Sequence, residues 1–319
     1  MKKFVFGLVF TFLTVITFAQ NISDFDVQGN DDGTMTILNY KGAIKDITIP
    51  EKIFNMPVVR LSEKSFKEKG LTSVVIPSTV TFIDQETFKG NQLRSATIAA
   101  TVEYIGDNAF EDNQLTTVTI PGSIITIGDD AFRNNSLTSL KIPDGVKSIG
   151  KSAFRGNNLT NITIGKDVEY IGDAAFYRNS LTSIIIPDNV KFIGSEAFNY
   201  NRLTNVIIGN GVVFIGDSAF GSDGNQITSL TLGNSIKYIG NYAFYAHRIT
   251  AIKIPDNVAS IGEQAFAPSS QNSLVNITIG KYVIFYGDCL GRGSYAYYNR
   301  NGGKAGKYTF TNGNWSYTP

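Results

Sequence analysis

A single phenylalanine recurs along most of this chain at an interval of 22 residues. The series runs unbroken from Phe66 to Phe220 and, after one interval of 24 residues, continues at Phe244 and Phe266. A fixed short period of this kind is the sequence signature of stacked repeats. Ten rows align on it, beginning at Leu71, Leu93, Leu115, Leu137, Leu159, Leu181, Leu203, Ile227, Ile249 and Leu274.

A single row is too short to fold by itself. Ordering its backbone costs on the order of 22–44 kcal/mol of conformational entropy. Burying its seven or so apolar side chains returns roughly 10–20 kcal/mol. Neighbouring rows must supply the missing burial and the backbone hydrogen bonds, which favours a continuous array.

The rows share the pattern L-T-x-V/I-x-I-P-x-x-V-x-x-I-G-x-x-A-F-x-x-N-x. The L-x-x-V-x-I segment ends in period-two alternation, which predicts a short strand with its apolar residues pointing inward. The glycine column, for example Gly128, predicts a tight bend. The Asp that often follows, such as Asp129, suits a turn or the N-cap of one helical turn. The expected fold is a solenoid of short parallel strands with little helix.

The asparagine near the end of each row suggests a structural ladder. A side-chain amide both donates and accepts, so stacked amides can satisfy backbone groups in a buried corner. His247 takes this place in one row, and we interpret it as a substitute hydrogen-bonding residue. The column comprises Asn91, Asn113, Asn135, Asn157, Asn179, Asn201, Asn225 and Asn272.

Charge and composition exclude several classes of function. The chain carries 28 Lys and Arg against 27 Asp and Glu, so no net field favours nucleic acid as a partner. Cys289 is the only cysteine and His247 the only histidine. Neither an intrachain disulfide nor the usual metal and nucleophile chemistry is therefore expected, and we predict no cofactor and no metal site.

Residues 1–20 have the features of a secretory signal peptide. Lys2 and Lys3 precede an apolar run from Phe4 to Phe18, and cleavage is expected near Ala19-Gln20. A membrane anchor is the alternative, although the run is short for one. No later stretch is long and apolar enough to span a bilayer, so the mature chain is expected to be secreted or held at the cell surface.

The rows resemble the BspA-like, or treponemal-type, leucine-rich repeats. The motif I-P-x-x-V-x-x-I-G-x-x-A-F stands nearly unaltered at 142–154 and 186–198, and the resemblance covers about 47–290. Two departures are a row of 22 residues where the family usually has 23, and Asn where it has Cys. The resemblance implies a leucine-rich repeat solenoid in a bacterial protein that binds extracellular proteins, glycans or other cells.

The ends differ in composition from the rows. Residues 21–70 are expected to hold an N-terminal cap and a divergent first repeat, and 71–290 the ten repeats. In 291–319 two aromatic segments flank Asn312-Gly313, which predicts a β-hairpin cap. An attachment or export signal, or an aromatic module that contacts sugars, remains an alternative for this tail.

One outward-facing candidate is the residue two places after the row's central Val. It is aromatic in seven of ten rows and Thr126, Ser148 or Ser260 in the others. If exposed, these side chains form an apolar stripe suited to protein or glycan contact; if buried, they only stabilise the array. The candidate binding residues are Phe82, Tyr104, Tyr170, Phe192, Phe214, Tyr238 and Phe285.

The sequence favours an adhesin-like interaction protein over an enzyme. A structural scaffold of the envelope without a specific ligand is the first alternative. A glycan-active enzyme is the second, but the Asp residues fall in repeat columns and a solenoid offers no deep cleft. The oligomeric state is left open.

Overall fold

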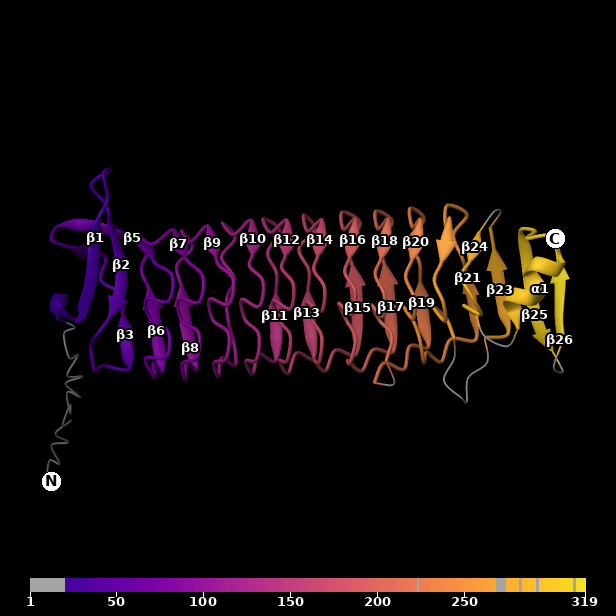
Figure 1. The fold of residues 1–319 in the computed structure, drawn as a ribbon, viewed down its shortest axis with the longest axis horizontal. Helices are drawn as coiled ribbons and strands as arrows, with labels where there is room; N and C mark the ends of the chain where they lie inside the picture. The colour runs from indigo at the N-terminus through magenta and orange to yellow at the C-terminus, as the bar shows by residue number, and fades with distance from the viewer. Residues whose placement is uncertain (1–20, 223, 268–273, 281–282, 291–292, 312–313) are drawn as a thin grey trace, which may run out of the picture.

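The computed structural model describes residues 21–222, 224–267, 274–280, 283–290, 293–311 and 314–319. The chain forms an elongated solenoid in which each row lies against the next (Figure 1). The predicted signal peptide (1–20), the ladder residue Asn272 and the turn Asn312-Gly313 lie outside the described residues. Among the described residues, no helix is long and apolar enough to cross a membrane.

A long sheet follows one face of the solenoid from end to end. Successive rows pair in parallel and in register, as in Thr126 with Ser148 and Ile127 with Ile149. Its strands are β1 Phe25–Gly29, β2 Met35–Tyr40, β5 Met56–Leu61, β7 Phe82–Ile83, β9 Tyr104–Ile105, β10 Thr126–Ile127, β12 Ser148–Ile149, β14 Tyr170–Ile171, β16 Phe192–Ile193, β18 Phe214–Ile215, β20 Tyr238–Ile239, β22 Ser260–Ile261 and β24 Ile284–Phe285, with β4 Lys52–Ile53 paired beside β5.

The predicted L-x-x-V-x-I strands form the opposite face as four shorter sheets. Their parallel order is interrupted three times, because 117–120 is not in a strand, β13 does not pair with β15, and β19 does not pair with β21. These strands are β3 Asp46–Thr48, β6 Ser73–Ile76 and β8 Ser95–Ile98; β11 Ser139–Lys141 and β13 Asn161–Thr163; β15 Ser183–Ile186, β17 Asn205–Ile208 and β19 Ser229–Thr231; and β21 Ala251–Lys253 and β23 Asn276–Ile279, which continue into the C-terminal hairpin.

The recurring phenylalanines form one buried stack between the two faces. From Phe66 to Phe266 each ring is fully buried and packs on the next, with ring centroids 5.1–5.5 Å apart. Offset stacking of rings at this separation adds to the free energy gained by burial. We call this stack the Phe file. It confirms the predicted in-register array.

The glycine column begins the predicted tight turn, since the Ala131 N–H donates to the Gly128 carbonyl at 3.4 Å, but it is close packing that requires glycine there. Gly128 does not have a left-handed backbone, but a Cβ there would lie 2.6 Å from the carbonyl carbon of Gly106. The Asp that follows the glycine does not cap a helix. Its side chain accepts a backbone hydrogen bond from the next row, as Asp107 Oδ1 does from the N–H of Asp129 at 2.8 Å. The residue after that Asp is left-handed, with φ of 57° at Asn108 and 53° at Asp130, so the segment is a turn.

Hairpins close the two ends of the solenoid on different sheets. At the N-terminal end β1 pairs antiparallel with β2 and is the first strand of the long sheet. At the C-terminal end β25 Gly306–Thr311 and β26 Asn314–Thr318 form the predicted hairpin, and β25 pairs antiparallel with β23 on the opposite face. The described helices are η1 Ile22–Asp24 and α1 Ser294–Arg300. The hairpin leaves β24 as the end strand of the long sheet.

Candidate binding face on the long sheet

The outward residue of each two-residue strand forms a line of side chains along the long sheet. In each strand the second residue, such as Ile171, is buried, so the first must point to solvent. Tyr170 is 40% exposed and Tyr238 47% exposed, whereas Phe192 and Phe214 are half-buried by their neighbours. We call this line the aromatic stripe: Phe82, Tyr104, Tyr170, Phe192, Phe214 and Tyr238.

The aromatic stripe is divided into two clusters. Phe82 and Tyr104 lie 6.4 Å apart at one end. Tyr170, Phe192 and Phe214 stack nearly parallel, with centroid separations of 5.0 and 4.8 Å. Thr126 and Ser148 separate the clusters in the same register. The face therefore offers a three-ring platform followed by Tyr238, and a smaller pair at a distance.

Phe285 does not belong to this stripe. In β24 it pairs with Ile261 and is buried, while Ile284 pairs with Ser260 and is 57% exposed. The last row is one residue shorter here, because a single residue separates the inward positions Val283 and Phe285. The apolar ring packs on Tyr298 of α1 at 4.7 Å, whereas burying the neighbouring Tyr286 in its place would strip water from a hydroxyl.

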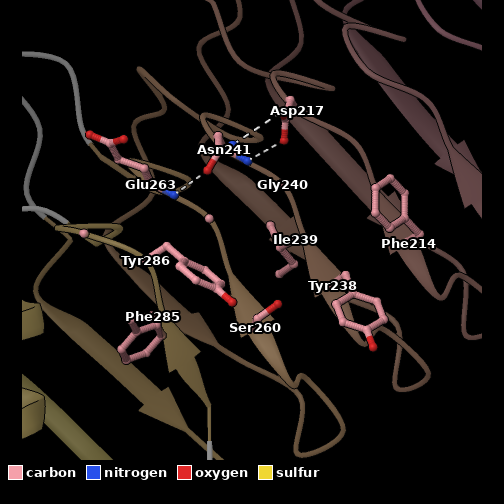
Figure 2. Close-up of a pocket in the computed structure, with 12 residues that line it drawn as sticks. Phe214, Asp217, Tyr238, Ile239, Gly240, Asn241, Ser260, Glu263, Phe285 and Tyr286 are labelled. Carbon is pink, nitrogen blue, oxygen red and sulfur yellow. Dashed lines mark hydrogen bonds between the residues drawn. The ribbon is translucent and has the colours of Figure 1, made fainter.

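A groove of about 570 Å³ lies beside the C-terminal part of the stripe (Figure 2). Phe214, Tyr238 and Tyr286 contribute rings to it, and Tyr286 is 57% exposed. Gly240 and Gly262 form part of its lining and leave space for the groove, because they have no side chains. Tyr286 was not a candidate from the sequence, since the last row was assigned one residue out of register.

The far side of the groove is a hydrogen-bonded polar wall. Asp217 Oδ1 accepts the N–H of Asn241 at 2.7 Å, and Asn241 Oδ1 accepts the N–H of Glu263 at 2.8 Å, as Figure 2 shows. All three side chains are exposed. These bonds fix Oδ1 of Asp217 and Oδ1 of Asn241 in position, while the Glu263 carboxylate faces solvent at the end of the wall. Aromatic faces opposite fixed acceptors suit a sugar or an amphipathic peptide.

A second groove of about 420 Å³ lies at the N-terminal cluster. Arg60 forms an ion pair with Asp84 at 2.9 Å, and its guanidinium lies 5.0 Å from the centre of the Phe82 ring. Partial burial, with Asp107 nearby, raises the pKa of the Tyr104 hydroxyl. Burial also raises the pKa of Tyr170, so both hydroxyls can donate hydrogen bonds at neutral pH.

The opposite face holds a third shallow groove. It has a volume of about 560 Å³ and lies where the strands are interrupted, between β13 and β15. Ile185 is 66% exposed on this face, and Thr163 and Lys166 also line the groove. This face has one large exposed apolar side chain in the groove and no aromatic lining.

The asparagine column lies inside the solenoid and away from both faces. Asn157 Oδ1 accepts the N–H of Leu137 at 3.0 Å, and its Nδ2 donates to the carbonyls of Phe132 and Phe154 at 2.9 and 3.1 Å. Oδ1 of every Asn in this column that the structure describes accepts the N–H of its row's first residue, and each Nδ2 donates to two Phe carbonyls. These residues are therefore committed to the framework.

His247 makes analogous bonds toward the following row. Its Nδ1 accepts the N–H of Ile249 at 2.9 Å, and its Nε2 lies 2.8 Å from the Phe266 carbonyl, which requires the proton on Nε2. Burial lowers the pKa of His247 to about 4.

The single cysteine is buried as well. Burial raises the pKa of the Cys289 thiol, so this thiol is not a ready nucleophile. Among the described residues, no group of three or more His, Cys, Asp and Glu side chains is placed to hold a metal ion.

Comparison with known families agrees with this architecture. A model of the BspA type leucine rich repeat region matches residues 59–181 and 169–290, with six copies, and so covers more than half of the chain. The chain belongs to this family. The assignment confirms the resemblance identified from the repeat motif. No curated protein sequence matches the chain.

Several solved bacterial structures have similar chains. A leucine rich cell surface protein from Faecalibacterium prausnitzii is 22% identical, with 86% of this chain and 95% of that chain covered and a TM-score of 0.49. The pneumococcal vaccine antigen PcpA is 22% identical, with 83% and 84% covered and a TM-score of 0.49. The T. pallidum leucine rich repeat protein is 22% identical, with 63% and 87% covered and a TM-score of 0.47.

Proposed function

We propose that this chain is a secreted or cell-surface interaction protein that binds an extracellular protein or glycan through the long sheet. The observation that carries the proposal is the groove beside Phe214, Tyr238 and Tyr286, with exposed rings on one side and fixed polar groups on the other. The cell-surface description of the F. prausnitzii protein is consistent with such a location. The predicted signal peptide would supply the export step.

The fold itself does not require aromatic residues in the stripe. Thr126, Ser148 and Ser260 occupy the same position in other rows and pair in the same register. Exposed apolar rings are costly to solubility when they have no partner, and a cluster of them marks a contact site. The aromatic side chains are therefore better explained by binding than by stability.

The test is binding of the mature protein to an array of extracellular matrix proteins and glycans. The double variant Y238S/Y286S is expected to lose at least about 10-fold in affinity for the captured ligand, because two stacking contacts are removed. The control is I185S, which removes a more exposed apolar side chain from the opposite face and should bind normally. Loss of binding in I185S alone would assign the ligand to the other face.

The same variants distinguish a structural envelope scaffold. A scaffold without a ligand would give no saturable binding, and Y238S/Y286S would behave as wild type in every assay.

A glycan-active enzyme is disfavoured because the Asp217 carboxylate in the groove already accepts a hydrogen bond from the backbone N–H of Asn241 in the following row. Turnover of a captured glycan that disappears in E263Q would contradict the proposal. A truncation ending at Leu290 tests whether the C-terminal hairpin contributes to binding or attachment.

A further inference from the structure

One corner of the solenoid carries an arginine in each of four consecutive rows. They lie in or next to the turn that contains the asparagine column: Arg133, Arg155, Arg178 and Arg202. Arg133 is paired, with Asp130 at 3.2 Å and Glu111 at 3.5 Å. The other three have no carboxylate within 4.0 Å among the described residues. The corner therefore has local positive charge although the chain is nearly neutral.

Two tyrosines hold these guanidinium groups in place. Arg155 lies 4.7 Å from the centre of the Tyr177 ring, and Arg178 lies 5.5 Å from it. Arg178 also lies 5.7 Å from the ring of Tyr200, which packs 5.3 Å from Tyr177. We call Arg155, Tyr177, Arg178 and Tyr200 the arginine–tyrosine corner. A guanidinium stacked on a ring keeps its N–H groups free at the edge, where they can bind an anion bidentately.

The turn of this corner has the same backbone conformation as the turns of other rows. Arg178 and Tyr200 both have φ of 54°, in the left-handed region. The equivalent residues in other rows are left-handed too, and they include both Gly90 and residues with side chains, such as Asp112. The corner therefore differs from the other turns in its side chains and not in its backbone. Tyr200 is 53% exposed, so its ring is accessible to a ligand.

The backbone of the corner is already hydrogen-bonded from row to row. Asn134 N–H donates to the Arg155 carbonyl at 2.9 Å, Gly156 N–H to Tyr177 at 2.9 Å, and Arg178 N–H to Asn199 at 3.1 Å. An extended peptide would find no free strand edge to pair with, and such pairing gives peptides much of their affinity. The corner instead offers positive charge and ring faces, repeated at the row spacing of the array.

We propose that the arginine–tyrosine corner binds an anionic polysaccharide. Sulfate or carboxylate groups would be held by Arg155 and Arg178, with Arg202 adding charge, and a sugar face would lie on the exposed ring of Tyr200. This site is distinct from the groove on the long sheet and does not depend on the function proposed for it.

The test uses the mature full-length protein and three immobilised probes: dextran sulfate, alginate and neutral dextran. Dextran sulfate and alginate distinguish sulfate from carboxylate recognition, and neutral dextran should not bind. R155Q/R178Q is expected to weaken binding to the charged probe by about 10-fold or more, because two charge-assisted contacts are lost. Y200S should weaken it less. Binding should also fall as NaCl is raised.

The matched control is R94Q/R300Q, which removes the same charge from exposed arginines outside the corner. It should change affinity less than about twofold, since unclustered surface charges contribute little. An equal loss in both double variants would show general attraction and overturn the proposal. So would wild-type binding by R155Q/R178Q, or binding of a poly-glutamate peptide or single-stranded DNA as tight as that of the charged polysaccharides. Circular dichroism of each variant excludes unfolding as the cause.

Discussion

Two lines of aromatic rings run along this solenoid, and they differ in almost every physical respect. The Phe file is present in every row from Phe66 to Phe266, is fully buried, and stacks without a gap. The aromatic stripe is interrupted by Thr126 and Ser148 and is followed by Ser260, and its last ring, Tyr238, is 47% exposed. Both lines follow the same 22-residue interval, so the repeat alone does not explain why one is buried and continuous and the other exposed and interrupted.

The difference shows which constraint acts on each line. A buried position surrounded by rows above and below admits one shape, because a smaller side chain leaves a cavity. At an outward position on a two-residue strand, the side chain needs only to be compatible with solvent exposure and with strand geometry. Variation between rows of one chain therefore distinguishes framework from usable surface, and the aromatic residues that persist at variable positions are the candidates for binding.

The largest expected effect comes from shortening one member of each line. Phe154→Ala should lower the free energy of unfolding by about 3–5 kcal/mol, since it removes a fully buried ring between two stacked neighbours. Tyr170→Ser should cost less than about 1 kcal/mol, because serine occupies that position in the adjacent row. Urea unfolding followed by circular dichroism measures both. Equal losses would mean that the stripe is part of the core.

The polar counterpart of the Phe file should be nearly as sensitive. Asn157→Ala leaves the Leu137 N–H and the carbonyls of Phe132 and Phe154 without their amide partner. The expected cost is about 3–4 kcal/mol, because unsatisfied buried polar groups are expensive. The control is Asn158→Ala, which alters the exposed neighbouring residue and should be almost neutral. A small loss at Asn157 would show that water replaces the amide.

His247 makes the framework sensitive to pH in a defined window. Its folded-state pKa of about 4 lies below the 6.5 of an unfolded histidine, so the unfolded chain binds the extra proton first as pH falls. The contribution of the neutral imidazole to the free energy of unfolding is fully present above pH 6.5. It is lost progressively as pH falls through about 4, and the total loss is about 3 kcal/mol. His247→Asn should remove this component. The measurement compares unfolding free energies of both proteins at pH 7 and pH 4.

Most of the framework could be predicted from the sequence because stacked rows align equivalent residues. Apolar spacing fixed the inward residues, and the amide chemistry of asparagine predicted a buried ladder, as at Asn157. His247 could be interpreted as a substitute because it falls in the same column. These inferences succeed where one row's environment repeats in the next.

The binding face was less predictable, for three physical reasons. The spacing V-x-x-I leaves two residues between inward positions, and it does not indicate that Tyr170 starts a strand on its own sheet. The register slip that buries Phe285 and exposes Tyr286 depends on packing against α1. The contact of Arg155 with Tyr177 joins neighbouring rows, which a column-by-column alignment does not reveal.

The smallest expected effect tests the turn that joins the two aromatic lines. Glu196 lies in this turn, is exposed, and has φ of 56°, whereas Glu103 is exposed next to the stripe and is not left-handed. Glu196→Gly should raise the free energy of unfolding by about 0.5–1 kcal/mol, because relief of left-handed strain exceeds the entropy cost of glycine. Glu103→Gly should lower it by a similar amount, because only the entropy cost remains. Thermal unfolding of the two variants should therefore shift in opposite directions. A shift in the same direction would mean that the turn between the lines relaxes freely, and the contrast between a rigid framework and an adaptable face would then need another origin.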